Sequence, residues 1–191
     1  MDLQISELSP LECERLINSV VVPRPIAWVT SQDGNGVRNL APFSYFNLVS
    51  VSPALLVISF RGPKDTLKNI EETGEFVVNI VSKSLSPQMV ASSEAFPPEI
   101  DEITVAGLET SPSRTVLPPR LALAKAALEC KRVQSIALGD GTLIIGEILH
   151  VFIDDGILES GRVSVTALAP VGRLGGAFYT SPDQPFRVNK P

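Results

Sequence analysis

Histidine and cysteine are scarce in this chain, and their scarcity narrows the chemistry open to it. His150 is the single histidine, which argues against a His-based zinc site and makes any Ser-His or Cys-His catalytic pair depend on that one residue. Cys13 and Cys130 lie far apart and form no CxxC pair. They predict the reduced thiols of a cytoplasmic protein, not a disulfide framework.

Other signals are missing from the sequence. No apolar run approaches the ~18 residues that a membrane span requires, and residues 1–16 carry acids and no apolar stretch of signal-peptide length. The net charge is -5 without a dense cluster of Lys and Arg, which argues against a nucleic-acid surface. Neither GxGxxG nor GxxxxGKS/T occurs, so the usual Rossmann and P-loop arguments do not apply. We expect a soluble, cytoplasmic globular protein.

Proline and glycine are plentiful, with 16 and 13 residues among 191, and they separate many short apolar runs. This spacing is typical of a fold rich in strands and turns. The length suits one domain with room for an appended arm.

Three segments have the pattern of short helices. Residues 9–19 begin with a serine cap followed by a proline in the first turn. Residues 64–73 are expected to use Asp65 or Thr66 as the N-cap, and a glycine closes the helix. Residues 82–94 form the third.

Strands are expected over 25–31, 37–43, 54–60 and 75–81, and over a long hairpin spanning about 125–153 around the turn GDGT. Regular pairing should end or form a bulge near Pro42, and the run 54–60 lacks alternation, as in a strand covered on both faces. Residues 97–120 are expected to run over the surface, and propensity leaves 121–130 open between helix and strand. The pattern favours a mostly antiparallel all-β barrel with peripheral helices.

The stretch NLAPFSYFN, residues 39–47, contains more polar groups than a core strand needs. Asn39, Ser44 and Asn47, beside three aromatic rings, suit a planar ring system that carries carbonyl and ring-nitrogen atoms. Alternatively, the rings belong to the core and the polar groups satisfy the backbone of a turn. The residues alone leave both interpretations open.

The stretch SFRGPKDT, residues 59–66, joins the end of a strand to the start of a helix. Arg61 and Lys64 beside the free amides of a helix N-terminus are what a phosphate group requires. Alternatively, both are solvated loop residues and Thr66 merely caps the helix. Together, the two stretches suit a flat heterocycle joined to a single phosphate, which is the shape of flavin mononucleotide (FMN).

The order of these segments resembles a known family. PRPIAWVTSQDGNGVRNLAPFSYFNLVSVSPALLVISF, KDTLKNIEETGEFVVNIV, QMVASS, LECKRVQSIALGDGTLIIGEILHVFI and PVGRLGGAFYT follow one another over roughly residues 20–180. In this order they resemble the flavin reductase-like, FMN-binding split-barrel family, which includes flavoredoxin-type proteins. The resemblance implies a Greek-key-like antiparallel split β-barrel over 20–180, flanked by a helical arm (1–19) and a tail (181–191), with strand over 121–138.

The resemblance also implies a cofactor site. FMN would bind noncovalently, near the interface of a homodimer, and no metal or protein nucleophile is needed because the flavin carries the chemistry. Asn39, Ala41, Ser44 and Asn47 would face the ring and ribityl chain, with Trp28 and Thr30 as ring neighbours. The residues expected around the phosphate are Ser59, Arg61, Lys64, Asp65 and Thr66.

The function implied is an FMN-dependent oxidoreductase that passes electrons from a reduced donor, with NADH or NADPH as candidates, to an acceptor or to free flavin. Gly141 stands where many relatives have a histidine that meets the nicotinamide donor. A catalytically silent flavin-binding carrier, sensor or partner subunit is therefore a second hypothesis, and a relative that binds another phosphorylated cofactor is a third.

Several residues outside these stretches keep two interpretations. His150 lies in an expected strand and is a structural residue or a substitute for the missing histidine. Cys130 is a small buried hydrophobe or a redox group near the flavin. Arg173 and Tyr179, in RLGGAFY, either pack a tight turn or reach the flavin site.

Overall fold

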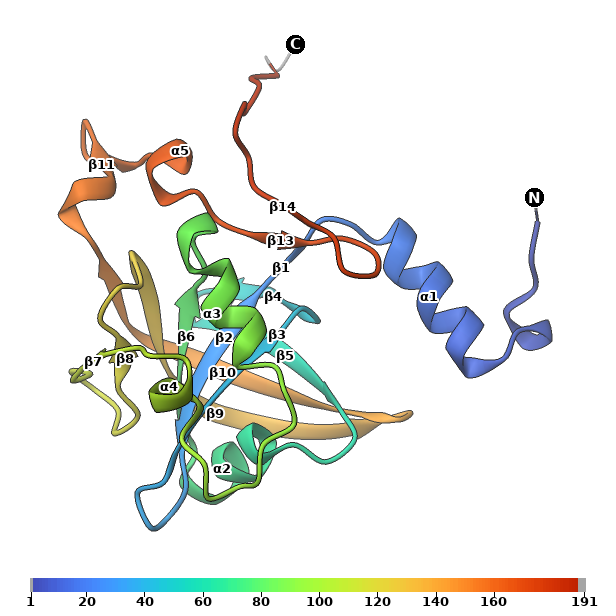
Figure 1. Cartoon of the computed structure of the whole chain (residues 1–191), viewed down its shortest axis with the longest axis horizontal. Coiled ribbons are helices and arrows are strands. Elements are labelled where there is room, and N and C mark those ends of the chain that lie inside the picture. The colour runs from blue at the N-terminus through green and yellow to red at the C-terminus, as the bar shows by residue number, and fades with distance from the viewer. Residues whose placement is uncertain (1, 189–191) are drawn as a thin grey trace.

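The computed structural model describes residues 2–188, so residues 189–191 of the expected tail lie outside the described residues. A seven-stranded sheet forms the centre of the molecule (Figure 1). In spatial order its strands are β3 (Arg38–Phe43), β2 (Ala27–Gln32), β6 (Glu75–Ile80), β9 (Ala126–Leu138), β10 (Gly141–Ile153), β5 (Ala54–Arg61) and β4 (Phe46–Val51). All neighbouring pairs are antiparallel, as predicted.

The strand order explains why the sheet closes on itself. β3 and β4 are its two edges, yet only Ser44 and Tyr45 separate them along the chain. Because an extended residue spans at most ~3.6 Å, the end of one edge lies within about 11 Å of the start of the other. The Tyr45 carbonyl accepts a hydrogen bond from the Ser59 N–H at 2.8 Å, which ties this link to β5. The sheet therefore curls into a barrel with a seam between β3 and β4.

Helices lie around this barrel. In α1 (Pro10–Val20), Ser9 caps the helix as predicted, and together with Glu12 it forms a reciprocal capping box. The predicted N-cap of α2 (Asp65–Thr73) was wrong, because Lys64 occupies that position and supplies no side-chain cap. Lysine is only a donor, so no side chain of the described residues caps the first turn. The predicted third helix divides into η2 (Lys83–Leu85) and α3 (Ser86–Ala91).

The remaining elements are short. They are η1 (Ile5–Glu7), β1 (Arg24–Pro25), α4 (Glu102–Val105), β7 (Thr110–Ser111), β8 (Arg120–Leu121), η3 (Asp155–Ile157), β11 (Leu158–Glu159), β12 (Arg162–Val163), α5 (Val165–Leu168), β13 (Gly172–Arg173) and β14 (Tyr179–Thr180). β9 and β10 form the predicted long hairpin, and residues 126–130, left open by propensity, belong to strand β9. The strand implied over 121–138 is wrong for residues 122–125, which lie in a turn between β8 and β9. Within residues 2–188, no helix is long and apolar enough to cross a membrane.

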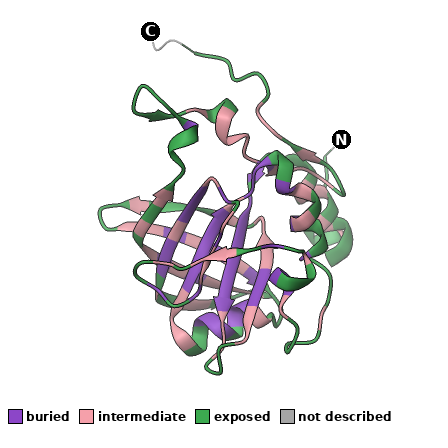
Figure 2. Ribbon diagram, turned by 60° about the vertical axis from the view of Figure 1, so that its left-hand side comes forward, coloured by how far each residue is buried: buried purple, intermediate pink, exposed green. Residues whose placement is uncertain are grey.

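Burial corrects two expectations (Figure 2). β5 alternates between buried and half-buried residues, whereas β2 is the strand covered on both faces, from Ala27 to Ser31. Residues 97–120 do more than run over the surface, because Ile103 is buried in a hydrophobic cluster with Trp28 and Leu40. The sequence hid this burial because α4, which carries Ile103, is only 4 residues long, too short for a periodic apolar pattern.

Candidate functional site

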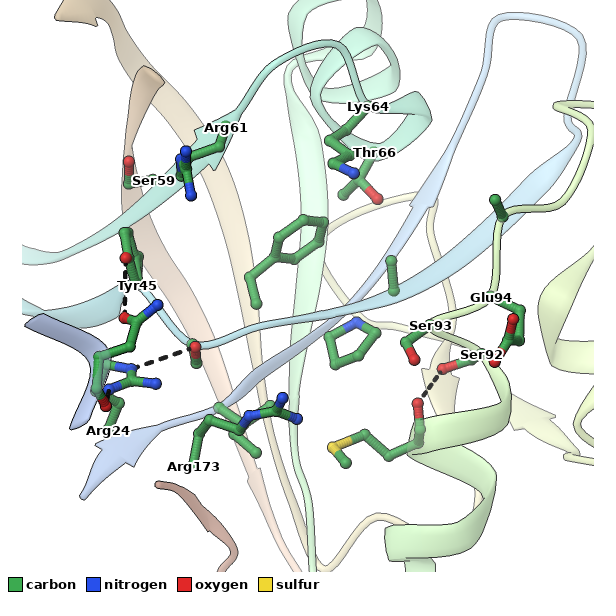
Figure 3. Close-up of a pocket in the computed structure, with 18 of the residues that line it drawn as sticks. Arg24, Tyr45, Ser59, Arg61, Lys64, Thr66, Ser92, Ser93, Glu94 and Arg173 are labelled. Carbon is green, nitrogen blue, oxygen red and sulfur yellow. Dashed lines mark hydrogen bonds between the residues drawn. The ribbon is translucent and has the colours of Figure 1, made fainter. Parts of the chain in front are cut away.

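A cavity of about 1240 Å³ opens at the seam of the barrel. Its walls come from α1, the β3–β4 link, the end of β5, the start of α2, the segment after α3 and the loop between β13 and β14. Figure 3 shows Ser59, Arg61, Lys64 and Thr66 along one side, with Arg24 and Arg173 on the opposite side. The volume exceeds the range of a common small-molecule site, about 300–1,000 Å³, so a cofactor-sized ligand has room to bind.

The cavity gathers most of the predicted site residues. Eight of the eleven line it: Asn39, Ala41, Ser44, Ser59, Arg61, Lys64, Asp65 and Thr66. They come from β3, the link after it, the end of β5 and the start of α2. NLAPFSYFN and SFRGPKDT are therefore two neighbouring walls of one cavity.

The other three predicted residues do not line the cavity. Trp28 is fully buried and donates from its indole nitrogen to Ser92 Oγ at 2.9 Å, so it lies behind the wall. Thr30 is also fully buried and donates to the Pro119 carbonyl at 2.6 Å. Asn47 is exposed, and its Oδ1 accepts from the N–H of the next residue in β4.

Arg61 dominates the electrostatics at the start of α2. Its Nη1 lies 2.6 Å from Glu14 Oε1 of α1, and its Nε and Nη2 lie 3.0 and 2.9 Å from Asp140 Oδ2 in the β9–β10 turn. These two carboxylates, Glu14 before Asp140, raise the pKa of the guanidinium above its ordinary value. Lys64 lies at the N-terminus of α2, whose first-turn amides favour an anion.

A buried polar network supports the wall beneath α2. Thr66 Oγ1 donates to Asn39 Oδ1 at 2.5 Å, and Asn39 Nδ2 donates to Glu102 Oε1 at 2.8 Å. Glu102 Oε2 accepts from the Leu40 N–H at 2.9 Å. Each group is over nine-tenths buried. The Thr66 hydroxyl therefore already donates its hydrogen bond to Asn39. The group of Thr66 that can donate to a ligand is its backbone N–H.

Sequence reasoning missed Glu102, which lines the cavity from α4. Desolvation by burial raises its pKa, although the hydrogen bonds from Leu40 and Asn39 partly oppose this. Its partner Asn39 is 63 positions away, so no local pattern could have found it. Arg24 was also missed: it donates to the Asn18, Val21 and Leu174 carbonyls at 2.8, 2.6 and 3.2 Å, which ties α1 to the C-terminal loop.

The structure also shows where the residues that kept two interpretations lie relative to the cavity. Arg173 and Tyr179 line the cavity and also form a tight turn, in which Arg173 donates to the Tyr179 hydroxyl and the Gly176 carbonyl. His150 lies away from it, with Nδ1 3.4 Å from the buried Glu129. Cys130 is fully buried in the barrel core, and desolvation raises the pKa of its thiol, as for a small hydrophobe. Gly141 pairs with Arg61 on β5 and does not line the cavity.

Comparison with known proteins identifies the family. Residues 19–171 match the flavin reductase like domain. The chain belongs to this flavin reductase-like family. The fold of this flavin reductase-like protein is a mainly β, antiparallel split barrel, as predicted.

Solved structures agree with this assignment. The flavin reductase-like protein is similar to nitrilotriacetate monooxygenase component B of Bacillus cereus, with 31% identity, 98% of each chain covered and a TM-score of 0.95. It is also similar to 2-nitrobenzoate 2-nitroreductase of Pseudomonas fluorescens, with 36% identity, 100% of this chain and 96% of that chain covered and a TM-score of 0.94. Flavoredoxin of Desulfovibrio vulgaris (Miyazaki F) shares the fold, with 20% identity, 100% and 97% of the chains covered and a TM-score of 0.83.

The substitution Glu102→Gln should change how stability depends on pH. Because burial raises the pKa of Glu102 above its ordinary 4.5, its contribution to the free energy of unfolding is complete below pH 4.5 and is lost as the pH rises through the raised pKa. The variant lacks this titration, and its single amide oxygen can accept from either the Leu40 N–H or Asn39 Nδ2 but not from both, so one buried donor loses its acceptor at a cost of about 1–3 kcal/mol at every pH. The stability difference should therefore narrow with rising pH in urea unfolding experiments.

Glu109→Gln provides the control, because Glu109 is exposed on the same segment. Its stability difference from the wild type should stay small across the same pH range. A difference for Glu102→Gln that is constant or widens with pH would contradict the assignment.

Proposed function

We propose that the protein is an FMN-dependent oxidoreductase of the flavin reductase type. It would pass electrons from a reduced donor, with NADH or NADPH as candidates, through noncovalent FMN to an acceptor or to free flavin. The observation that carries this proposal is the pairing of two walls in one cavity. One wall holds Arg61, Lys64 and the start of α2, and the adjoining wall is the edge strand β3.

The first wall suits a phosphate. Ser59, Arg61 and Lys64 line it with a hydroxyl and two cations, while Asp65 and Thr66 open α2 and contribute backbone N–H groups. An uncapped helix N-terminus beside an arginine favours an anion through its amides, its dipole and a bidentate contact. Asp65 itself is acidic, so we assign it a backbone role.

The second wall suits a planar ring. Asn39, Ala41 and Ser44 lie along β3 and the link that follows, with short side chains that leave the backbone accessible. As an edge strand, β3 has backbone groups on one side that no strand pairs. These groups and Ser44 Oγ would orient the heterocycle. We leave Trp28, Thr30 and Asn47 out of this assignment, because they do not line the cavity.

A bound flavin supplies the redox chemistry. The residues of this chain bind and orient it and keep water from its buried face. Titratable side chains are not required for this task, and so the absence of His150 from the cavity lining is no objection. The similarity to a monooxygenase component and to a nitroreductase supports an oxidoreductase. We include a cytoplasmic location in the proposal, because Cys13 and Cys130 are both free thiols.

Gly141 supports a second candidate, a flavin-binding carrier, sensor or partner subunit without turnover. A Cβ at this position would lie 3.2 Å from the Phe60 carbonyl and 3.3 Å from Ser59 Oγ. These contacts leave little room for a side chain, so position 141 itself supplies no group toward a nicotinamide donor.

Arg61→Ala should weaken the binding of FMN much more than that of riboflavin, which lacks the phosphate. A charge-assisted hydrogen bond contributes about 1.5–3 kcal/mol. The Arg61 side chain is 40% exposed, so solvent screening places the expected loss near the lower end, about tenfold in Kd. Titration of flavin fluorescence measures both constants. Equal losses for FMN and riboflavin would show that Arg61 does not touch the phosphate.

Anaerobic reduction separates the two candidate functions. The FMN-loaded protein should show the two visible flavin bands and lose them when NADH or NADPH is added without oxygen. Bleaching by dithionite but by neither nicotinamide would favour the carrier or sensor. A protein that stays colourless after incubation with FMN would contradict both candidates.

We also propose a homodimer with the flavin near its interface. No residue of α1 is buried, and Leu11, which lines the cavity, is 54% exposed. Leu48 and Val51 of β4, at the other edge of the seam, are 61% and 88% exposed. Apolar surface of this kind commonly marks an interaction site. Sedimentation equilibrium should give twice the chain mass of 20.5 kDa, and a single species of 20.5 kDa would contradict the dimer.

A further inference from the structure

Arg61 is held by two carboxylates that approach different parts of its guanidinium. Asp140 Oδ2 contacts Nε and Nη2 at 3.0 and 2.9 Å, so it occupies one edge of the planar group. Glu14 Oε1 contacts Nη1 at 2.6 Å, at the other end. A phosphate that binds arginine through two parallel hydrogen bonds needs one edge of this fork. With Asp140 on the Nε edge, the edge formed by Nη1 and Nη2 remains, and Glu14 occupies part of it.

The contact between Glu14 and Arg61 is able to exchange. Their side chains are 38% and 40% exposed, so water can replace either partner and the pair contributes little to stability. A buried ion pair would resist such replacement, because its separated charges would remain desolvated.

Helix α1 carries Glu14 to the Arg61 guanidinium, and few other side-chain contacts hold this helix against the barrel. Glu14 and Asn18 are four positions apart and therefore share a face, and both line the cavity. The C-terminal half of α1 is tied down, because Tyr45 donates to Asn18 Oδ1 at 2.9 Å and Arg24 donates to the Asn18 and Val21 carbonyls. Nearer the start of α1, the described residues show one side-chain contact between this helix and the barrel, the ion pair of Glu14 with Arg61.

We propose that Glu14 is an affinity-determining residue that competes with the cofactor phosphate for Arg61, whereas Asp140 positions the same guanidinium for binding. The inference rests on the proposed phosphate site. Two carboxylates on one arginine thus have different effects: removing the charge of Glu14 strengthens the binding of a phosphorylated flavin, and removing that of Asp140 does not.

The test compares Kd for FMN and riboflavin in the full-length protein carrying Glu14→Gln, Asp140→Asn or Glu7→Gln, by flavin fluorescence titration. Glu7→Gln is the matched control, since Glu7 is exposed and its side chain has no hydrogen bond or ion pair within residues 2–188. An exposed ion pair contributes about 0.2–1 kcal/mol, so Glu14→Gln should tighten FMN by about 1.5- to 5-fold. Riboflavin should be unaffected, and Asp140→Asn should weaken FMN or leave it unchanged.

The outcomes separate this inference from the proposed function. If Arg61→Ala weakens FMN selectively but Glu14→Gln leaves FMN unchanged or weakens it, the phosphate site stands and the competition is overturned. If Glu7→Gln or Asp140→Asn tightens FMN binding as much as Glu14→Gln does, the effect comes from net charge alone. That result would also overturn the competition. If Arg61→Ala acts equally on both flavins, the phosphate site itself is wrong.

Discussion

The cavity depends on a seam whose two edges are held close but cannot pair along their length. The link of Ser44 and Tyr45 keeps β3 near β4, and the hydrogen bond from Ser59 N–H to the Tyr45 carbonyl fixes that link. Along β3, Glu102 takes the Leu40 N–H, and Pro42 has no N–H to offer. An edge without these donors is a poor template for another strand. The barrel therefore stays split, and the gap is available to a ligand.

The walls of this gap come from distant parts of the chain, and buried polar contacts hold them in register. Thr66, Asn39 and Glu102 join the start of α2 to β3 and α4. Arg24, 8% exposed, joins the end of α1 to the β13–β14 loop through carbonyl acceptors. Each contact satisfies groups that would otherwise be buried without partners, which is costly. This framework fixes the cations of the cavity, with Arg61 and Lys64 on one side of it and Arg173 on the opposite side.

Local chemistry made much of the fold predictable, and distance along the chain set the limit. Ser9 with Pro10 predicted α1, Gly74 predicted the end of α2, and β-branched residues around GDGT predicted the long hairpin. The two site stretches were found because each carries its own polar signal. Glu102 was missed because its partner Asn39 is 63 positions away, and Arg24 because it binds backbone carbonyls, which carry no sequence signal, one of them 150 positions away. Trp28 and Thr30 were expected at the ring, but their side chains bond Ser92 and Pro119 instead.

A crystal structure of the protein grown with FMN tests the central claim most directly, because the claim concerns where one ligand lies. We expect the phosphate at Arg61 and the first turn of α2, the ring along Asn39 to Ser44, and Glu14 no longer in contact with Nη1 of Arg61. A flavin bound outside the seam, or one whose phosphate points away from α2, would contradict the account.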